Sequence, residues 1–264
     1  MLVMKNLKSR IKKGEAVNGC WLNLGSSLTA EIVGAAAFDW VLIDLEHGTG
    51  NEKDVLSQLQ ALESSNAAAI VRIESAARQR IHRVLDVGAE GVMCPHINNA
   101  DEAKMVVSGL RYPPHGSRGV AKMIRATGFG KNFEEYSSRA NENIVGIVQI
   151  ETTEALQHLD EIAAIDGIDV LFIGPADLTM ALGIFGRFEH SLFRDAVKAT
   201  VSAAKKAGKA TGILLFNPDD YNTYYDLGMR MIACGADATF VADGSRNMAA
   251  KLNTSRSYHL KSIK

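Results

Sequence analysis

Short apolar segments rich in β-branched residues alternate along this sequence with longer segments of helical periodicity. Apolar runs of this kind are typical of parallel strands that are buried on both faces. The alternation repeats eight times, with strands expected at 18–24, 40–43, 68–73, 91–94, 144–150, 170–173, 211–216 and 229–233. Eight strand–helix units predict an α/β fold, specifically a closed (β/α)8 TIM barrel, with an open doubly wound sheet as the alternative.

Chain length and composition agree with a single barrel domain spanning 1–264. The chain has 264 residues, of which 47% are hydrophobic, and a typical barrel of this kind has roughly 250 residues. No linker or shift in composition divides the sequence. The net charge of −1 gives no indication of a nucleic-acid partner, and no apolar run has the length expected of a membrane span.

The three cysteines indicate the cellular compartment of the protein. Cys20, Cys94 and Cys234 are far apart and lie in apolar segments. Their spacing fits neither a disulfide framework nor a zinc site, so we interpret them as buried thiols of a cytoplasmic protein.

Three segments lie outside the regular alternation. Residues 1–13 are expected to form a short amphipathic lead-in helix, and residues 245–252 a final helix. The segment 111–130 contains two prolines, four glycines and several cations. It is too long for an ordinary connection, so we expect a functional loop there.

Two neighbouring strands end in carboxylates. Glu151 follows the run 144–150, and Asp177 follows the run 170–173 after a short Gly-Pro-Ala segment. The two strands are joined by a helical segment, which brings their carboxyl ends to the same edge of a parallel sheet. Two like charges at one site repel each other, and a divalent cation such as Mg²⁺ or Mn²⁺ would offset this repulsion. The alternative is that each carboxylate caps the following helix.

Further polar residues follow other strands and are expected at the same mouth of the barrel. Arg72 ends the third strand, His47 follows the second, and Gln149 precedes Glu151 by two positions, so both point to one side of their strand. The planar guanidinium of Arg72 suits a carboxylate or an enolate, and a histidine carries protons near neutral pH. A cation on the carboxylates would stabilise the enolate of a 2-oxo acid.

Each of these residues has a structural alternative. His47 could bond to backbone in a loop, and Arg72 could pair with Glu46 or Glu74. Asp86 falls on a helix and, by pattern alone, is a solvated surface carboxylate. His96 follows Pro95 at a strand end and could face the mouth or the solvent.

Taken together, these segments resemble the HpcH/HpaI aldolase family, the class II pyruvate aldolases. Its members include aldolases of 4-hydroxy-2-oxoheptanedioate and of 2-dehydro-3-deoxy sugar acids. The resemblance runs from about residue 11 to about residue 242 and is carried by the segments 38–40, 44–48, 71–72, 85–88, 111–119, 148–152 and 173–178.

The resemblance implies a role for each matching residue. Glu151 and Asp177 match the metal ligands, for Mg²⁺ or Mn²⁺ with Co²⁺ or Zn²⁺ as alternatives, and Arg72 matches the pyruvate-binding arginine. His47 with Asp86 matches a dyad for proton transfer. The remaining positions match substrate contacts: Gln149, the backbone of Gly174, Pro175 and Ala176, and an apolar wall at Trp21.

For the whole protein, the resemblance implies a lyase that reversibly cleaves a 4-hydroxy-2-oxo acid to pyruvate and an aldehyde. The alternatives are decarboxylation of oxaloacetate or C–C bond formation from it through the same enolate, and a barrel that binds a 2-oxo acid without catalysis. Family members exchange their last helix and assemble as hexamers, trimers of dimers, and Arg118 and Arg125 lie in the long loop, which could reach a neighbour. His96, Phe216 and the segments 48–50 and 127–130 depart from the family pattern, which leaves the aldehyde open.

Overall fold

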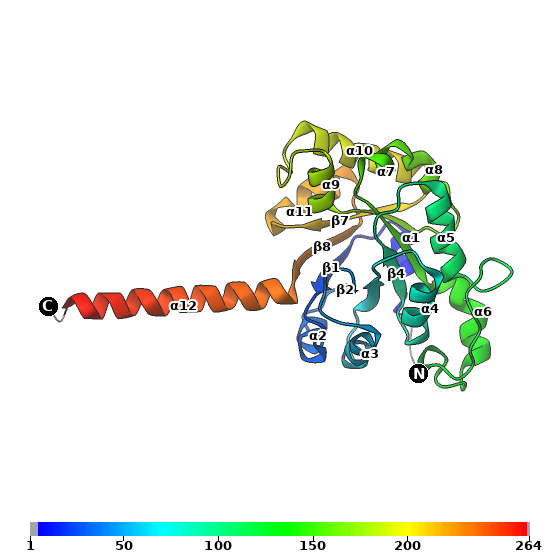
Figure 1. Ribbon diagram of the computed structural model, residues 1–264, viewed down its shortest axis with the longest axis horizontal. Helices are drawn as coiled ribbons and strands as arrows, with labels where there is room; N and C mark the ends of the chain where they lie inside the picture. Colours follow the sequence, from blue (N-terminus) through cyan, green and yellow to red (C-terminus); the bar gives the residue numbers. More distant parts are fainter. Residues whose placement is uncertain (1–4, 263–264) are drawn as a thin grey trace.

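The eight expected strands form a closed barrel in the computed structural model, which describes residues 5–262 (Figure 1). Every neighbouring pair is parallel, and β8 pairs with β1 to close the sheet. The predicted barrel is therefore confirmed, and the open sheet is excluded. The strands are Val17–Leu22 (β1), Trp40–Asp44 (β2), Ala68–Arg72 (β3), Gly91–Cys94 (β4), Val145–Ile150 (β5), Val170–Ile173 (β6), Ala210–Leu215 (β7) and Met231–Ala236 (β8).

Helices surround this barrel in the order that the alternation predicts. They are Leu7–Lys12 (α1), Ser27–Gly34 (α2), Glu52–Ala61 (α3), Arg78–Asp86 (α4), Ala100–Leu110 (α5), Phe133–Asn143 (α6), Thr153–Gln157 (α7), Leu159–Ala163 (α8), Pro175–Ala181 (α9), Ser191–Lys206 (α10), Tyr221–Leu227 (α11) and Asp237–Ser262 (α12). Short 3-10 turns cover Arg125–Thr127 and Pro218–Asp220. The lead-in helix is shorter than expected within the described residues, and its predicted first four positions lie outside them.

Alternation along each strand decides what fills the barrel. Trp40 and Leu42 of β2 and Ala68 and Ile70 of β3 belong to one buried cluster, the barrel interior. Because side chains alternate between the two faces of a strand, the next inward positions are Asp44 and Arg72. The inward side chains are thus apolar at the bottom and polar at the carboxyl ends, where ligands of such barrels bind.

Helix α1 closes the other end of the barrel. Leu7 packs into the interior cluster. Lys8 forms an ion pair of 2.9 Å with Asp169 and donates a hydrogen bond of 2.7 Å to the carbonyl of Ile144, which ties the helix to the starts of β5 and β6. Helix α1 therefore covers the amino-terminal end of the barrel interior.

The last helix differs most from its expected bounds. Helix α12 covers 26 residues, far beyond the predicted 245–252, and Figure 1 shows it extending away from the barrel as a separate arm. Its exposed apolar residues include Phe240, Met248 and Leu252. The prediction failed because these apolar positions do not form a stripe that packs on the helix's own barrel.

Among residues 5–262, no helix is both long enough and apolar enough to cross a bilayer.

Candidate active site

A buried ion pair joins the ends of β2 and β3. Asp44 and Arg72 are register partners on these neighbouring strands, and both point into the barrel. Asp44 accepts bonds of 2.9 Å from Nε and 2.8 Å from Nη2 of Arg72, the bidentate geometry that suits a guanidinium and a carboxylate. The Asp44 side chain is fully buried, and that of Arg72 is 8% exposed. Arg72 is therefore held in one orientation at the mouth.

Sequence reasoning missed Asp44, although a signal for it was present. Asp44 has the same parity as the inward residues Trp40 and Leu42 and lies level with Arg72. Asn23, which was also not predicted, donates a hydrogen bond of 2.7 Å to the second carboxylate oxygen of Asp44. Alternation and register together could have identified the carboxylate, but not the asparagine in the loop after β1.

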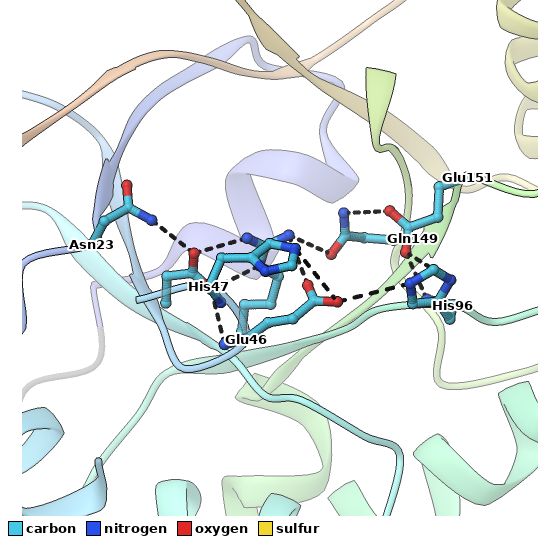
Figure 2. A network of polar contacts seen from close by, with 8 residues as sticks. Asn23, Glu46, His47, His96, Gln149 and Glu151 are labelled. Atoms are coloured by element: carbon cyan, nitrogen blue, oxygen red, sulfur yellow. Dashed lines mark hydrogen bonds and ion pairs between the residues drawn. The ribbon is translucent and has the colours of Figure 1, made fainter. Parts of the chain in front are cut away.

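Glu46 links the guanidinium to two imidazoles (Figure 2). Its Oε2 lies 2.9 Å from Nη1 of Arg72, close enough for an ion pair although the N–H is not aligned for a hydrogen bond. Its Oε1 lies 4.0 Å from Nε2 of His47 and 3.9 Å from Nε2 of His96. The predicted alternative of an Arg72–Glu46 pair is thus present, whereas Glu74 pairs with Arg80. His96 faces the mouth.

Gln149 connects the arginine to the acidic part of the site. Its amide donates a hydrogen bond of 3.0 Å to Oε2 of Glu151, and its carbonyl accepts one of 3.4 Å from Arg72. Oε1 of Glu151 accepts the backbone N–H of His96 at 2.7 Å. The two side chains lie on one side of β5 (Figure 2), as their spacing predicted.

Glu151 is an acid buried beside other acids. Its side chain is 1% exposed. Burial raises its pKa, the N–H and ring of His96 lower it, and the charges of Asp177 and Glu46 raise it further. Charge repulsion from Asp177 agrees with the expected convergence of the two strand ends. In the free protein these carboxylates destabilise one another.

Neither carboxylate acts as a helix cap, so that alternative is not supported. Thr152, not Glu151, caps α7 by accepting the N–H of Ala155. Helix α9 begins at Pro175 after Gly174 without a side-chain cap, and Asp177 lies in its first turn. A Cβ on Gly174 would overlap the Glu151 carboxylate and the Gln149 amide, so only glycine leaves this approach open.

This donor set fits a divalent cation held by two carboxylates. Glu151 is buried beside the like charge of Asp177, its pKa is raised, and Gly174 leaves space next to its carboxylate. These features agree with a hard cation that completes its coordination shell with water or substrate oxygens. No group of three or more acidic, histidine or cysteine side chains is arranged as a metal cage within the described side chains.

Asp86 does not lie near His47 in the folded chain. It is the last residue of α4, which returns to the amino-terminal end of the barrel before β4, whereas His47 follows the carboxyl end of β2. Its carboxylate instead accepts a bond of 3.1 Å from Arg118. The expected His47–Asp86 dyad is therefore not formed within one chain, because the two residues lie at opposite ends.

Two arginines of the long loop, Arg118 and Arg125, bond to groups of the same chain. The Arg118 side chain is fully buried, donates to the hydroxyl of Tyr136 at 3.0 Å and stacks 4.5 Å from the ring centre of Tyr112. Arg125 donates to the carbonyl of Val87. The Arg118 side chain thus holds the loop to α4 and α6, and the expectation that the loop could reach a neighbouring subunit stays a prediction.

Two further residues singled out from the sequence are Trp21 and Phe216. Trp21 is 4% exposed, and the Arg72 guanidinium lies 5.9 Å from its ring centre. It packs on Trp40 and Phe172 and so forms the apolar floor below the arginine. Phe216 is exposed and stacks on Phe188.

The fold and site together define a barrel enzyme with an acidic centre beside a fixed arginine at the carboxyl ends of its strands. Comparisons with known proteins identify its family. A model of the HpcH/HpaI aldolase/citrate lyase family matches residues 18–244, and the chain belongs to this family.

Relatives agree over nearly the full length. A 4-hydroxy-2-oxo-heptane-1,7-dioate aldolase from Salmonella dublin is 39% identical, with 96% of this chain and 97% of the relative covered. A solved family protein from Burkholderia cenocepacia J2315 superposes with a TM-score of 0.89 at 35% identity, covering 94% of this chain and 99% of the other. An HpcH/HpaI aldolase from Desulfitobacterium hafniense DCB-2 superposes with a TM-score of 0.85 at 28% identity, covering 92% of this chain and 96% of the other. The predicted family, and with it an enzyme of the aldolase class, is confirmed.

Proposed function

We propose that this enzyme reversibly cleaves a 4-hydroxy-2-oxo acid to pyruvate and an aldehyde, using a divalent cation held by Glu151 and Asp177. The observation that carries the proposal is the fixed Arg72 guanidinium, tied through Gln149 to a buried carboxylate that lies beside a second one. A cation at the acids and a guanidinium beside them would bind the two negative oxygens of a 2-oxo acid together.

Each residue has a defined task in this proposal. Arg72 binds the pyruvate oxygens, because Asp44 occupies one edge of the guanidinium and leaves other N–H groups for the ligand. Gln149 orients the substrate oxygen between Arg72 and Glu151. The backbone N–H groups of Gly174 and Ala176 lie at the start of α9, whereas Pro175 has no N–H. The Trp21 ring forms the apolar wall of the pocket.

When bound, a divalent cation supplies Lewis-acid stabilisation of the negative charge on the 2-oxo oxygen. Mg²⁺ or Mn²⁺ suits the oxygen donors best, with Co²⁺ or Zn²⁺ as alternatives. His47 removes the proton of the C4 hydroxyl, or of a water beside it. Its ring is 64% exposed, and its Nε2 lies 4.0 Å from the Glu46 carboxylate.

The test of the reaction uses purified protein before and after chelation. We expect the metal-free enzyme to lose both retro-aldol cleavage and deuterium exchange at the pyruvate methyl group, and Mn²⁺ or Mg²⁺ to restore them. Undiminished cleavage by metal-free protein would refute the metal role. Release of CO₂ from oxaloacetate without any aldehyde product would favour a decarboxylase, and pyruvate binding without exchange would favour a non-catalytic barrel.

Asp86 takes part only if a second copy brings it to the mouth. We therefore propose a homo-oligomer, a hexamer built as a trimer of dimers, in which α12 is exchanged and Asp86 of a neighbour pairs with His47. The arm-like α12 with exposed apolar side chains supports exchange. So does the position of Asp86 at the far end of its own barrel.

Complementation tests this arrangement. His47→Ala and Asp86→Ala, each inactive alone, are co-expressed with different tags and purified as mixed assemblies. Random pairing would restore both residues at about one site in four, so activity should return to about that fraction of wild type. No recovery in a verified mixture would show that the two residues do not act across the interface.

We also propose a cytoplasmic location for the 1–264 barrel domain. Its three cysteines are unpaired, with Cys20 and Cys94 buried, which suits a reducing compartment.

A further inference from the structure

The first residue of α12 is a buried carboxylate that the proposed chemistry does not use. Asp237 is 2% exposed, although α12 as a whole extends away from the barrel (Figure 1). A buried charge is costly unless donors surround it. Within the described part of the chain, the donors that meet this charge are N–H and O–H groups, and most of them come from a segment far away in the sequence.

Four donors surround the Asp237 carboxylate. One is the N–H of Ala238, in the same helical turn, at 2.8 Å. The other three lie in the segment after β1: the N–H of Asn23 at 2.7 Å, the N–H of Leu24 at 3.4 Å and the hydroxyl of Thr29 at 2.6 Å. A bond within its own turn is all that the start of a helix needs from a side chain. The three remaining bonds fix the segment between β1 and α2 to the start of α12.

Asn23 extends this connection into the active site. Its side-chain amide donates a hydrogen bond of 2.7 Å to Oδ2 of Asp44 (Figure 2), the oxygen that also accepts Nη2 of Arg72 at 2.8 Å. Its carbonyl accepts the N–H of Thr49, in the loop after β2, at 3.0 Å. A residue that is fixed by α12 thus contacts both the carboxylate that holds the guanidinium and the loop beside it.

The connection is short and has little freedom. Three hydrogen bonds of 2.7, 2.7 and 2.8 Å join the Asp237 carboxylate to the guanidinium of Arg72. Both backbone groups of Asn23 are bonded, so only its side-chain torsions are left to vary. A guanidinium that binds a small anion must keep its direction to within a fraction of an ångström, and hydrogen-bonded neighbours provide that precision.

We propose that Asp237 is a positioning residue for pyruvate, a role that it fulfils by fixing Asn23. Asn23 in turn orients the Asp44 carboxylate and with it the guanidinium of Arg72. Asp237 does not touch the substrate, because its own oxygens are occupied by the four donors. This inference rests on the proposed function and adds a residue outside the mouth on which the affinity for pyruvate depends.

The test measures the KM for pyruvate in deuterium exchange of its methyl group, with the enzyme saturated by Mn²⁺. Asp237→Ser keeps an oxygen that can bond its own helical turn but lacks the second oxygen and the reach of the carboxylate. We expect this variant to raise the KM about fivefold, the effect of one hydrogen bond of ordinary strength. The kcat of exchange should stay within about twofold of wild type, because no group that touches pyruvate is removed.

The conservative variant Asp237→Asn should restore the wild-type KM. Its oxygen can accept the N–H groups of both Asn23 and Ala238, which share one oxygen of the native carboxylate, and its amide can donate to the Thr29 hydroxyl. Asp169→Ser is the matched control. Asp169 is a buried carboxylate at the opposite end of the barrel, where it accepts the N–H of Gly146 at 2.9 Å. Its loss should lower the Tm and leave the KM unchanged.

A double-mutant cycle separates the connection from a general loss of structure. Asn23→Ala breaks the bond to Asp44, so Asp237→Ser should raise the KM no further in that background. A full additional rise there, an unchanged KM in Asp237→Ser alone, or an equal rise in Asp169→Ser would each overturn the inference. Absence of exchange in the wild-type holoenzyme would instead refute the proposed function, a result that is distinct because it requires no variant.

Discussion

The Asp44–Arg72 pair gives the sharpest prediction for stability. We consider Asp44→Asn, which keeps the shape of the side chain and removes its charge. The native carboxylate is fully buried and accepts two bonds from Arg72 and one from Asn23. It also accepts the backbone N–H of Glu46 at 3.1 Å. The amide offers one acceptor oxygen and turns two N–H donors toward groups that are themselves donors.

The expected loss follows from the burial of both partners. Removing one partner of a buried ion pair costs about 3–5 kcal/mol, because the remaining charge is left uncompensated. Glu46 remains 2.9 Å from Nη1 of Arg72 and retains part of the compensation. We therefore expect a loss near the lower end, about 3 kcal/mol in the free energy of unfolding, which corresponds to a Tm decrease of about 6–12 °C.

The assay is urea and thermal unfolding of metal-free protein, with Asp166→Asn as the matched control. Asp166 also pairs with an arginine, Arg111 at 2.6 Å, but its side chain is 87% exposed. Exposed pairs contribute about 1 kcal/mol or less, since solvent screens them. Equal losses for the two variants would refute the claim that burial makes the Asp44 pair strong.

Catalysis gives a second readout of the same substitution. Without Asp44 the guanidinium is no longer fixed at two bonds, so Arg72 should bind pyruvate in a poorer orientation. A charge-assisted hydrogen bond contributes about 1.5–3 kcal/mol, and we expect the pyruvate KM to rise by about tenfold or more. An unchanged KM would remove the positioning role while leaving the stability argument intact.

Three further predictions concern other groups. Burial raises the pKa of Glu151, so in metal-free protein its contribution to stability is present at low pH and is lost as the pH rises through the folded pKa. Mild acid should therefore stabilise metal-free protein relative to Glu151→Gln and weaken Mn²⁺ binding, which calorimetry would show. Burial also raises the pKa of the Cys20 thiol to about 12, and alkylation at pH 8 should label it only after unfolding. Arg118→Lys should lower the free energy of unfolding by about 2 kcal/mol, because lysine cannot reproduce the guanidinium's stacking and its bonds to Asp86 and Tyr136; urea unfolding would measure it.

Strand positions and the acidic pair were predictable because their signals are local. An apolar run ending at Glu151, and parity that places Gln149 beside it, need no knowledge of the rest of the chain. The prediction of Asp44 as a site residue would have required one further step, the register between β2 and β3. The contacts of Arg118 could not be predicted, because its partners Asp86 and Tyr136 come from two helices distant in the sequence. No local sequence pattern indicates a contact of this kind.

The topology of the barrel also limits what one chain can do. Residues after strands gather at the mouth, and residues that end helices gather at the opposite end, whatever their chemistry. His47 belongs to the first class and Asp86 to the second. A matching pair of residue types in the sequence therefore does not indicate a pair in the fold. If both residues act in one reaction, the topology that separates them within a chain requires that a neighbouring chain supply one of them. Helix α12, which extends away from its own barrel, could bind that neighbouring chain.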